Sequence, residues 1–199
     1  MDIQDMKKYF DRVQLCKIYD DFTYTYSKCE GVSAAVFKVE IPTAGKYTFS
    51  VSQRGERMFP KNSGYEYSDT RCFLVKINAK DADTKVTYIK GKKAMKTRDC
   101  FLEIEELEEG SYYFVGEVDW IESTESQNFA VTSYGAGGAI WEAIEDIDKN
   151  QVIRYAAESI VAKGEGVEME PNAEDPLIVK HTVTSDFGYQ IICIKNGAE

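Results

Sequence analysis

Two residues near the C-terminal end of the chain have the side-chain types of a thiol nucleophile and its base. His181 is the single histidine among 199 residues, and Cys193 is one of five cysteines. A cysteine protease also requires an orienting group and an oxyanion hole at a helix N-terminus. Cys193 lies within the apolar run 191–194, and the surrounding sequence suggests no such groups. We therefore expect a structural cysteine in a core strand, a histidine at the surface or rim, and no enzymatic activity.

Two acidic segments have the first positions of a calcium-binding loop. They are residues 146–150, which read DIDKN, and residues 81–83, which read DAD. An EF-hand loop requires glycine at its sixth position and glutamate at its twelfth. The first segment has Gln151 and Ala157 at those positions, and the second has Val86 at the sixth. The sequence therefore predicts no EF-hand and no metal ligands, while a looser calcium site between loop carboxylates stays open as an alternative.

A glycine-rich segment, residues 135–140, follows one predicted strand and precedes a predicted helix. Dinucleotide-binding fingerprints occupy such positions because their glycines let the backbone approach a pyrophosphate. Here Ile140 stands at the third glycine position, and no parallel strand–helix–strand pattern surrounds the segment. We expect a turn at the end of a strand, and no cofactor.

A cluster of cations stands out in an otherwise acidic chain. A basic loop of this kind can dock anionic lipid headgroups or an acidic protein surface. The alternative is a solvated hairpin whose charges are balanced by the glutamates at positions 103–109. The residues of this basic patch are Lys90, Lys92, Lys93, Lys96 and Arg98.

Three tyrosines are candidate anchors for a partner, because tyrosine tolerates both buried and wet surroundings. They are Tyr65, Tyr67 and Tyr112. The cores of β-sandwiches also use many tyrosines, so the pattern leaves both roles open.

The elements that would position these residues change character early in the chain. Met6, Tyr9, Phe10 and Val13 fall at helical spacing, which predicts a short amphipathic helix within residues 1–18. After this segment, apolar and polar residues alternate with a period of two. That period is typical of strands with one buried face.

The remaining chain repeats the strand pattern between turn signals. The clearest alternation covers residues 35–41 and 47–51, joined by a Pro–Thr–Ala–Gly turn that predicts a hairpin. About ten short strands with little helix predict an all-β, antiparallel β-sandwich at residues 19–199. Beyond this hairpin and a strand at 22–26, the predicted strands are 71–77, 86–90, 99–104, 111–120, 129–134, 152–161, 177–184 and 189–194, with a short helix at 141–147.

Composition excludes several classes of protein. No apolar run approaches the roughly 20 residues of a membrane span, so we expect no integral membrane segment. A net charge of -10 argues against general nucleic-acid binding, which requires a positive field. The five cysteines are widely spaced, without a C-x-x-C pair, and the N-terminus lacks the apolar region of a signal peptide. We expect a cytoplasmic protein with free, mostly buried thiols.

The N-terminal sequence resembles the segment that closes the protease core of calpains. Residues 1–10 read MDIQDMKKYF, and residues 13–16 read VQLC. The chain beyond this segment is similar to calpain domain III, a C2-like β-sandwich, as it occurs in calpain-like proteins of ciliates and other protists. The likeness extends over residues 42–47, 112–120 and 129–135, with a weaker echo at 188–196.

This resemblance implies a fold and argues against an activity. It predicts two parts, a tail of the protease core at residues 1–18 and a single sandwich at 19–199. The calpain catalytic residues lie upstream of the matching segment, so none of the five cysteines and not His181 corresponds to them. Domain III in calpains bridges other domains and binds phospholipid, partly through a dense acidic loop. No comparable run occurs here, and calcium and lipid binding are therefore not carried over.

Two functions are hypotheses at this point. The first is a non-catalytic interaction or scaffold module that docks to other proteins, with the cytoskeleton and the ciliary axoneme as the setting that the resemblance suggests. Microtubules are acidic outside, so the basic patch would be the contact. The alternative is a membrane-targeting module that binds anionic phospholipid, with or without calcium.

Overall fold

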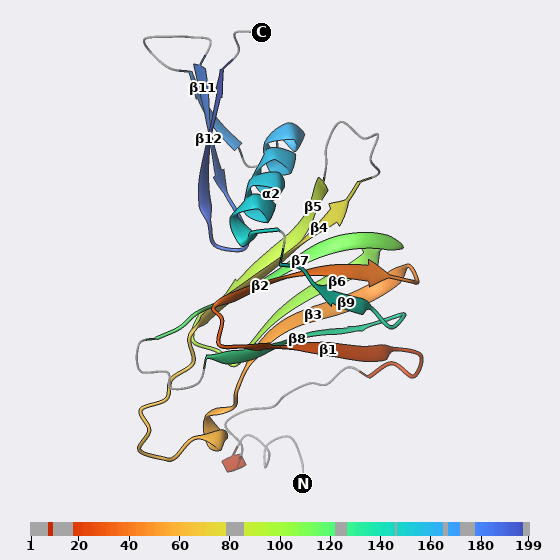
Figure 1. Ribbon diagram of the computed structural model, residues 1–199, viewed down its shortest axis with the longest axis vertical. Coiled ribbons are helices and arrows are strands. Elements are labelled where there is room, and N and C mark those ends of the chain that lie inside the picture. Colours follow the sequence, from red (N-terminus) through yellow and green to blue (C-terminus); the bar gives the residue numbers. More distant parts are fainter. Residues whose placement is uncertain are drawn as a thin grey trace.

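The computed structural model describes residues 8–9, 18–78, 86–121, 127–145, 147–164, 167–171 and 178–196. These residues form two antiparallel sheets that pack face to face, with an α-helix and a third, smaller sheet beyond one of them (Figure 1). No helix within these ranges has the length and apolar character needed to cross a membrane.

The sandwich consists of sheets I and II. Sheet I has the strand order β1-β8-β3-β6, and sheet II has the order β5-β4-β7-β2-β9. The strands of sheet I are β1 (Thr23–Glu30), β3 (Gly45–Gln53), β6 (Asp99–Leu107) and β8 (Asn128–Gly135). Those of sheet II are β2 (Ala34–Ile41), β4 (Asp69–Ile77), β5 (Val86–Ala94), β7 (Gly110–Asp119) and β9 (Ile140–Ala143).

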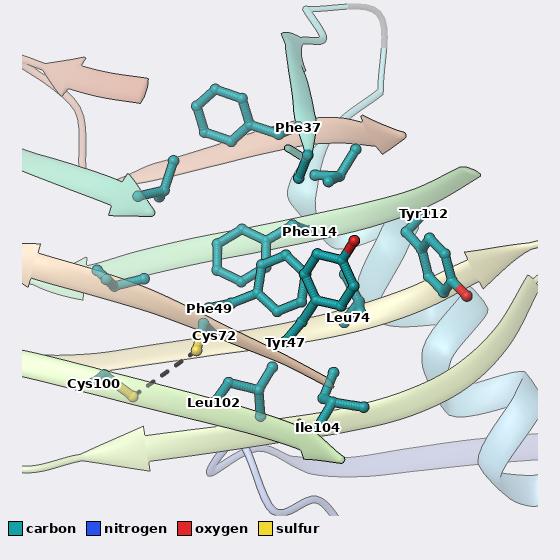
Figure 2. Packing of buried hydrophobic residues seen from close by; sticks show 14 of the residues in the cluster. Phe37, Tyr47, Phe49, Cys72, Leu74, Cys100, Leu102, Ile104, Tyr112 and Phe114 are labelled. Atoms are coloured by element: carbon teal, nitrogen blue, oxygen red, sulfur yellow. Dashed lines mark hydrogen bonds between the residues drawn. The ribbon is translucent and has the colours of Figure 1, made fainter. Parts of the chain in front are cut away.

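One apolar core fills the space between the two sheets. Every second residue of β3 points into it, so that Tyr47, Phe49 and Val51 are fully buried. The ring of Phe49 lies 5.6 Å from that of Phe114 on the facing sheet. Figure 2 shows these rings stacked between the strands with Leu74 beside them. This core holds the sheets at a fixed separation and makes each outer face a rigid surface.

Helix α2 (Lys149–Lys163) lies on the outer face of sheet II. It begins at Asp148, whose side chain accepts a hydrogen bond from the backbone N–H of Asn150. It ends at Gly164, which has the left-handed conformation (φ 71°) typical of a helix C-cap. Val152 and Ala156 of the helix are fully buried against this face.

Sheet III completes the C-terminal part of the molecule. Its strands are β10 (Val167–Pro171), β11 (Ile178–Thr184) and β12 (Gln190–Asn196), in that order and antiparallel. In the turn between β11 and β12, Phe187 inserts its fully buried ring against Phe73 of sheet II, 4.4 Å away. A single-turn helix, η1 (Glu56–Met58), interrupts the long loop after β3.

The predicted all-β antiparallel sandwich is confirmed. The strands expected at 71–77, 86–90, 99–104, 111–120, 129–134, 177–184 and 189–194 correspond to β4, β5, β6, β7, β8, β11 and β12 within a few residues. The strand expected at 22–26 is β1, which runs on to residue 30. The helix expected at residues 1–18 lies outside the described residues, except that residues 8–9 are helical.

Two local predictions are wrong. Residues 152–161 form helix α2 and not a strand, because Val152 and Ala156 are buried at a helical spacing of four between two capping residues. Residues 141–145 do not form the helix expected at 141–147. Instead, β9 pairs with residues 37–40 of β2 at the edge of sheet II.

The predicted hairpin of residues 35–51 is also wrong in its pairing. β2 pairs with β7 and β9 in sheet II, whereas β3 pairs with β6 and β8 in sheet I. The turn between them therefore crosses from one sheet to the other. The expected inner face is nevertheless confirmed, since Phe37, Val39 and Ile41 are buried in the shared core.

Candidate binding face

No described helix or strand packs over the outer face of sheet I, and only the segment before β1 covers it in part, at Tyr134. Its side chains form rows across the strands because residues that pair in register point to the same side. One row joins Tyr26, Thr132, Ser50 and Phe101, and the next joins Tyr24, Tyr134, Thr48 and Glu103. We call these eight residues the tyrosine face.

The aromatic side chains of this face are open to solvent. Tyr24 and Tyr26 are 60% and 59% exposed, and Phe101 at the opposite edge is 47% exposed. The rings of Tyr24 and Tyr26 stack at 6.2 Å, so they present one continuous aromatic area along β1. Large apolar groups in such positions add little to folding and are available for contact with another molecule.

Small hydroxyl residues occupy the centre of the face. The Ser50 hydroxyl lies 2.7 Å from that of Thr132 and 3.3 Å from that of Ser52. Their hydrogen-bonding needs are thus largely met within the sheet. The centre therefore consists of small side chains that bond to one another, between aromatic side chains at both edges.

Tyr134 is held in place by the segment that leads into β1. Its hydroxyl accepts a hydrogen bond from the backbone N–H of Tyr19 at 2.8 Å and donates one to the Tyr19 carbonyl at 3.2 Å. The ring of Phe22 lies 5.1 Å from that of Tyr134. These contacts fix the ring before any partner arrives.

Glu103 is the one charged residue of the tyrosine face, and along β1 beside it follow charges of both signs, Lys28 and then Glu30. Within the part of the chain that the structure describes, Glu103 and Glu30 form no ion pair. Lys46 and Arg98 form ion pairs with the neighbouring carboxylates of Glu105 and Asp99, each at 2.7 Å. A partner that carries cations would therefore be favoured here.

The structure places the basic patch on β5 and its turn into β6, where most of its charges have partners. Lys93 Nζ lies 3.4 Å from Asp69, Lys96 Nζ lies 4.0 Å from Glu66, and Arg98 pairs with Asp99. Lys90 crosses to sheet I and donates to the Glu103 carbonyl at 2.9 Å. Lys92 is exposed and forms no ion pair among the described residues. These partner carboxylates are not the glutamates at positions 103–109 that the alternative named. Binding by this patch stays a prediction.

His181 and Cys193 lie opposite each other on neighbouring strands. His181 is buried and not at the surface, and its Nδ1 has no hydrogen-bond partner among the described residues. The strand that contains Cys193 is only partly a core strand, because Ile192 and Ile194 are exposed.

The candidate metal and nucleotide segments have ordinary structural roles where they are described. Residues 81–83 and Asp146 lie outside the described residues, and the residues that the structure describes contain no cluster of three acidic, histidine or cysteine residues that could hold a metal ion. The glycine-rich segment links β8 to β9 as a turn. A Cβ at Gly135 would lie 2.1 Å from the Tyr47 ring, so core packing explains this glycine.

Of the three candidate anchor tyrosines, Tyr112 is a core residue. It is fully buried and donates to the Glu108 carbonyl at 2.8 Å, and burial raises the pKa of Tyr112 to about 12. Tyr65 and Tyr67 are half-buried and brace the loop after β3, with Tyr65 stacked on Phe59 at 3.9 Å. The sequence patterns did not identify Tyr24, Tyr26 and Phe101 as candidate contact residues. Alternation places them on the side opposite Cys29 and Cys100, but only the strand pairing shows that the cysteine side is the core.

A buried ionic cluster joins sheet II to the C-terminal elements. Glu117 of β7 accepts hydrogen bonds from Lys149 of α2 at 2.7 Å and from the hydroxyl of Tyr189. Arg71 lies 3.7 Å from Glu117, pairs with Asp119 and stacks over the Tyr189 ring. Burial and the bond to Glu117 raise the pKa of Tyr189. The cluster locks α2 and sheet III to the sandwich.

No protein-family model matches this chain, and a search of curated proteins finds no match either. The resemblance to calpain domain III therefore stays a prediction.

Proposed function

We propose that this chain is a non-catalytic interaction module that binds a protein partner through the tyrosine face. The observation that carries the proposal is the exposed aromatic area of Tyr24, Tyr26 and Phe101 on a rigid sheet. In this proposal the module acts in the cytoplasm, and a cytoskeletal or ciliary setting rests on the resemblance alone.

The shape of the face suits a protein surface. Four strands of about eight residues span roughly 19 Å by 26 Å, and the groove between α2 and β12 includes no residue of these strands. Small molecules are usually bound in concave pockets, whereas standard protein interfaces bury about 800 Å² on each partner. Tyrosines are enriched in such interfaces because they supply a large contact area at a low entropic cost.

The chemistry of the face defines the partner. The carboxylates of Glu103 and Glu30, which have no ion pair among the described residues, favour a surface with lysine or arginine side chains around an apolar contact. An arginine could also stack on the exposed ring of Tyr26. We therefore expect a partner that is basic at its contact surface, bound more weakly as the salt concentration rises.

The test compares baits that differ only on this face. Wild-type protein, the double variant Tyr24→Ser/Tyr26→Ser and the variant Glu103→Lys are used to capture partners from the native cell. Ile140→Ser, which changes an exposed side chain on β9, is the matched control. We expect one set of partners to be retained by wild type and control, lost by the double variant and reduced by Glu103→Lys. Equal retention by all four baits would refute the proposal.

Flotation with vesicles of anionic phospholipid, with and without calcium, tests the alternative. We expect no flotation that depends on the tyrosine face. Binding that is lost on Lys92→Glu and unchanged in the double tyrosine variant would instead support the phospholipid-binding function and argue against ours.

A further inference from the structure

The C-terminal strand β12 forms one edge of sheet III, and its other side pairs with no strand among the described residues. In Figure 1, β11 and β12 extend beyond the sandwich beside α2. An open edge presents unpaired backbone groups that can pair with another strand.

The turn before β12 fixes which backbone groups point outward. The Tyr189 carbonyl accepts a hydrogen bond from the Ser185 N–H at 2.9 Å, so the backbone of Tyr189 points toward β11. Backbone direction alternates along a strand, and residues 191, 193 and 195 therefore also bond to β11. The N–H and C=O groups of Gln190, Ile192, Ile194 and Asn196 point to the open edge.

The side chains at this edge are unusually apolar for an exposed strand. Ile192 and Ile194 are 56% and 71% exposed and pair in register with Thr182 and Lys180. Both isoleucines line a groove whose other side is helix α2, at Ile153 and Arg154. The charge of Lys180 is paired with Glu170 at 3.2 Å. Natural edge strands are commonly guarded by proline, a bulge or a central charge, and β12 has its one charged residue near its end.

The sequence of β12 is complementary to itself in one antiparallel register. With a two-fold axis at position 193, Ile192 lies opposite the partner's Ile194, and Gln190 lies opposite the partner's Asn196. In each of these pairs, the N–H and C=O groups of both residues point to the open edge, so the two residues can hydrogen-bond to each other. A shift by one pair keeps one isoleucine opposite its own copy and sets the other isoleucine against Gln190 or Asn196. The register about position 193 is the one that matches both types of residue.

We propose that two copies of this chain pair through β12 in this register and join their third sheets into one continuous six-stranded sheet. The interface is isologous, because the same strand contributes on both sides. It leaves the tyrosine face uncovered, because that face belongs to sheet I and the interface to sheet III. A dimer would thus carry two tyrosine faces, although its formation does not depend on their function.

The test measures the mass of the full chain in solution over a wide range of protein concentration, by analytical ultracentrifugation. Ile192→Pro removes an N–H that points to the open edge and leaves the bonds to β11 intact, as proline is tolerated at such positions. Ile194→Lys adds a charge to the apolar centre. Ile140→Lys places the same charge on another exposed isoleucine, 63% exposed at the edge of sheet II, and is the matched control.

We expect wild type and Ile140→Lys to dimerise with the same dissociation constant. Both β12 variants should raise that constant by about ten-fold or more while circular dichroism remains unchanged. A wild-type protein that stays monomeric at every concentration overturns the proposal. So does a dimer that both β12 variants leave intact, or one that Ile140→Lys weakens equally.

Discussion

The two outer faces of the sandwich are made from similar strands, but the face of sheet II is covered and that of sheet I is exposed. On sheet II, Val36, Phe73 and Val115 point outward and are buried beneath α2 and Phe187. On sheet I, Tyr24, Tyr26 and Phe101 point outward and remain exposed. Burial of the first face stabilises the fold, whereas the aromatic groups of the second add little to it. This difference is the physical reason to assign partner binding to sheet I.

The largest expected difference in stability is between a phenylalanine that covers sheet II and one on the exposed face of sheet I. Phe187→Ala removes a fully buried ring that stacks on Phe73 at 4.4 Å, and should lower the free energy of unfolding by about 3–5 kcal/mol. Phe101→Ala, on the exposed face, should lower it by less than about 1 kcal/mol. Urea unfolding of both variants makes the measurement. Equal losses would show that the two faces do not differ.

The next effect concerns the ionic cluster under α2. Glu117→Ala leaves Lys149 without its carboxylate and Arg71 with Asp119 alone, and should destabilise the protein by about 3 kcal/mol. The control is Glu40→Ala, which breaks the half-exposed pair with Lys38 on the same sheet and should change stability by less than about 1 kcal/mol. Thermal unfolding can compare the two. Similar losses would indicate that the cluster is not effectively buried.

A smaller effect on stability is expected where the turn between β11 and β12 approaches Gly91 of β5. A Cβ at Gly91 would lie 2.7 Å from the Cβ of Phe187, so Gly91→Ala must push the turn away from β5. We expect a loss of about 1–3 kcal/mol. Gly55→Ala, where nothing lies within 4 Å, is the control and should change stability by at most about 0.5 kcal/mol. Hydrogen exchange at β12 would report the loosening, and unchanged exchange would contradict this contact.

Alkaline pH should lower the stability of the protein through Tyr189, which packs against the covered face of sheet II. The folded protein raises the pKa of Tyr189 above the ordinary value of 10.0, through burial and the bond to Glu117. The folded state therefore prefers the protonated phenol, and this contribution is complete below pH 10.0 and lost as the pH rises through the raised pKa. Tyr189→Phe should lose less stability than wild type between neutral pH and about pH 11. Parallel losses in both proteins would argue against this linkage.

The sandwich could be predicted from sequence because its strands alternate, as Tyr47, Phe49 and Val51 do. The helix was mispredicted because its apolar positions include β-branched residues such as Val152 and Ile153, which also favour strands. Its caps, Asp148 and Gly164, were visible signals. The partners of β2 and β3 could not be predicted, since a turn that crosses between sheets has the same residues as a hairpin turn.

The tyrosine face was harder to predict for a related reason. Alternation shows that Tyr24 and Tyr26 share one side of β1, but not whether that side meets the core or the solvent. The side becomes known only when β1 pairs with β8, which sets Cys29 beside Phe129 in the core. Such pairing joins residues about one hundred positions apart, and no local pattern encodes it.

The smallest expected effect tests the open face directly. Tyr26→Ser should change the free energy of unfolding by no more than about 0.5 kcal/mol, because its ring is 59% exposed. The same substitution at the fully buried Tyr112 should lower it by about 3–5 kcal/mol and serves as the control. A large loss for Tyr26→Ser in urea unfolding would mean that the ring is covered in the intact protein. In that case the aromatic area on sheet I, like the valines on sheet II, would serve folding, and the argument for a docked partner would fail.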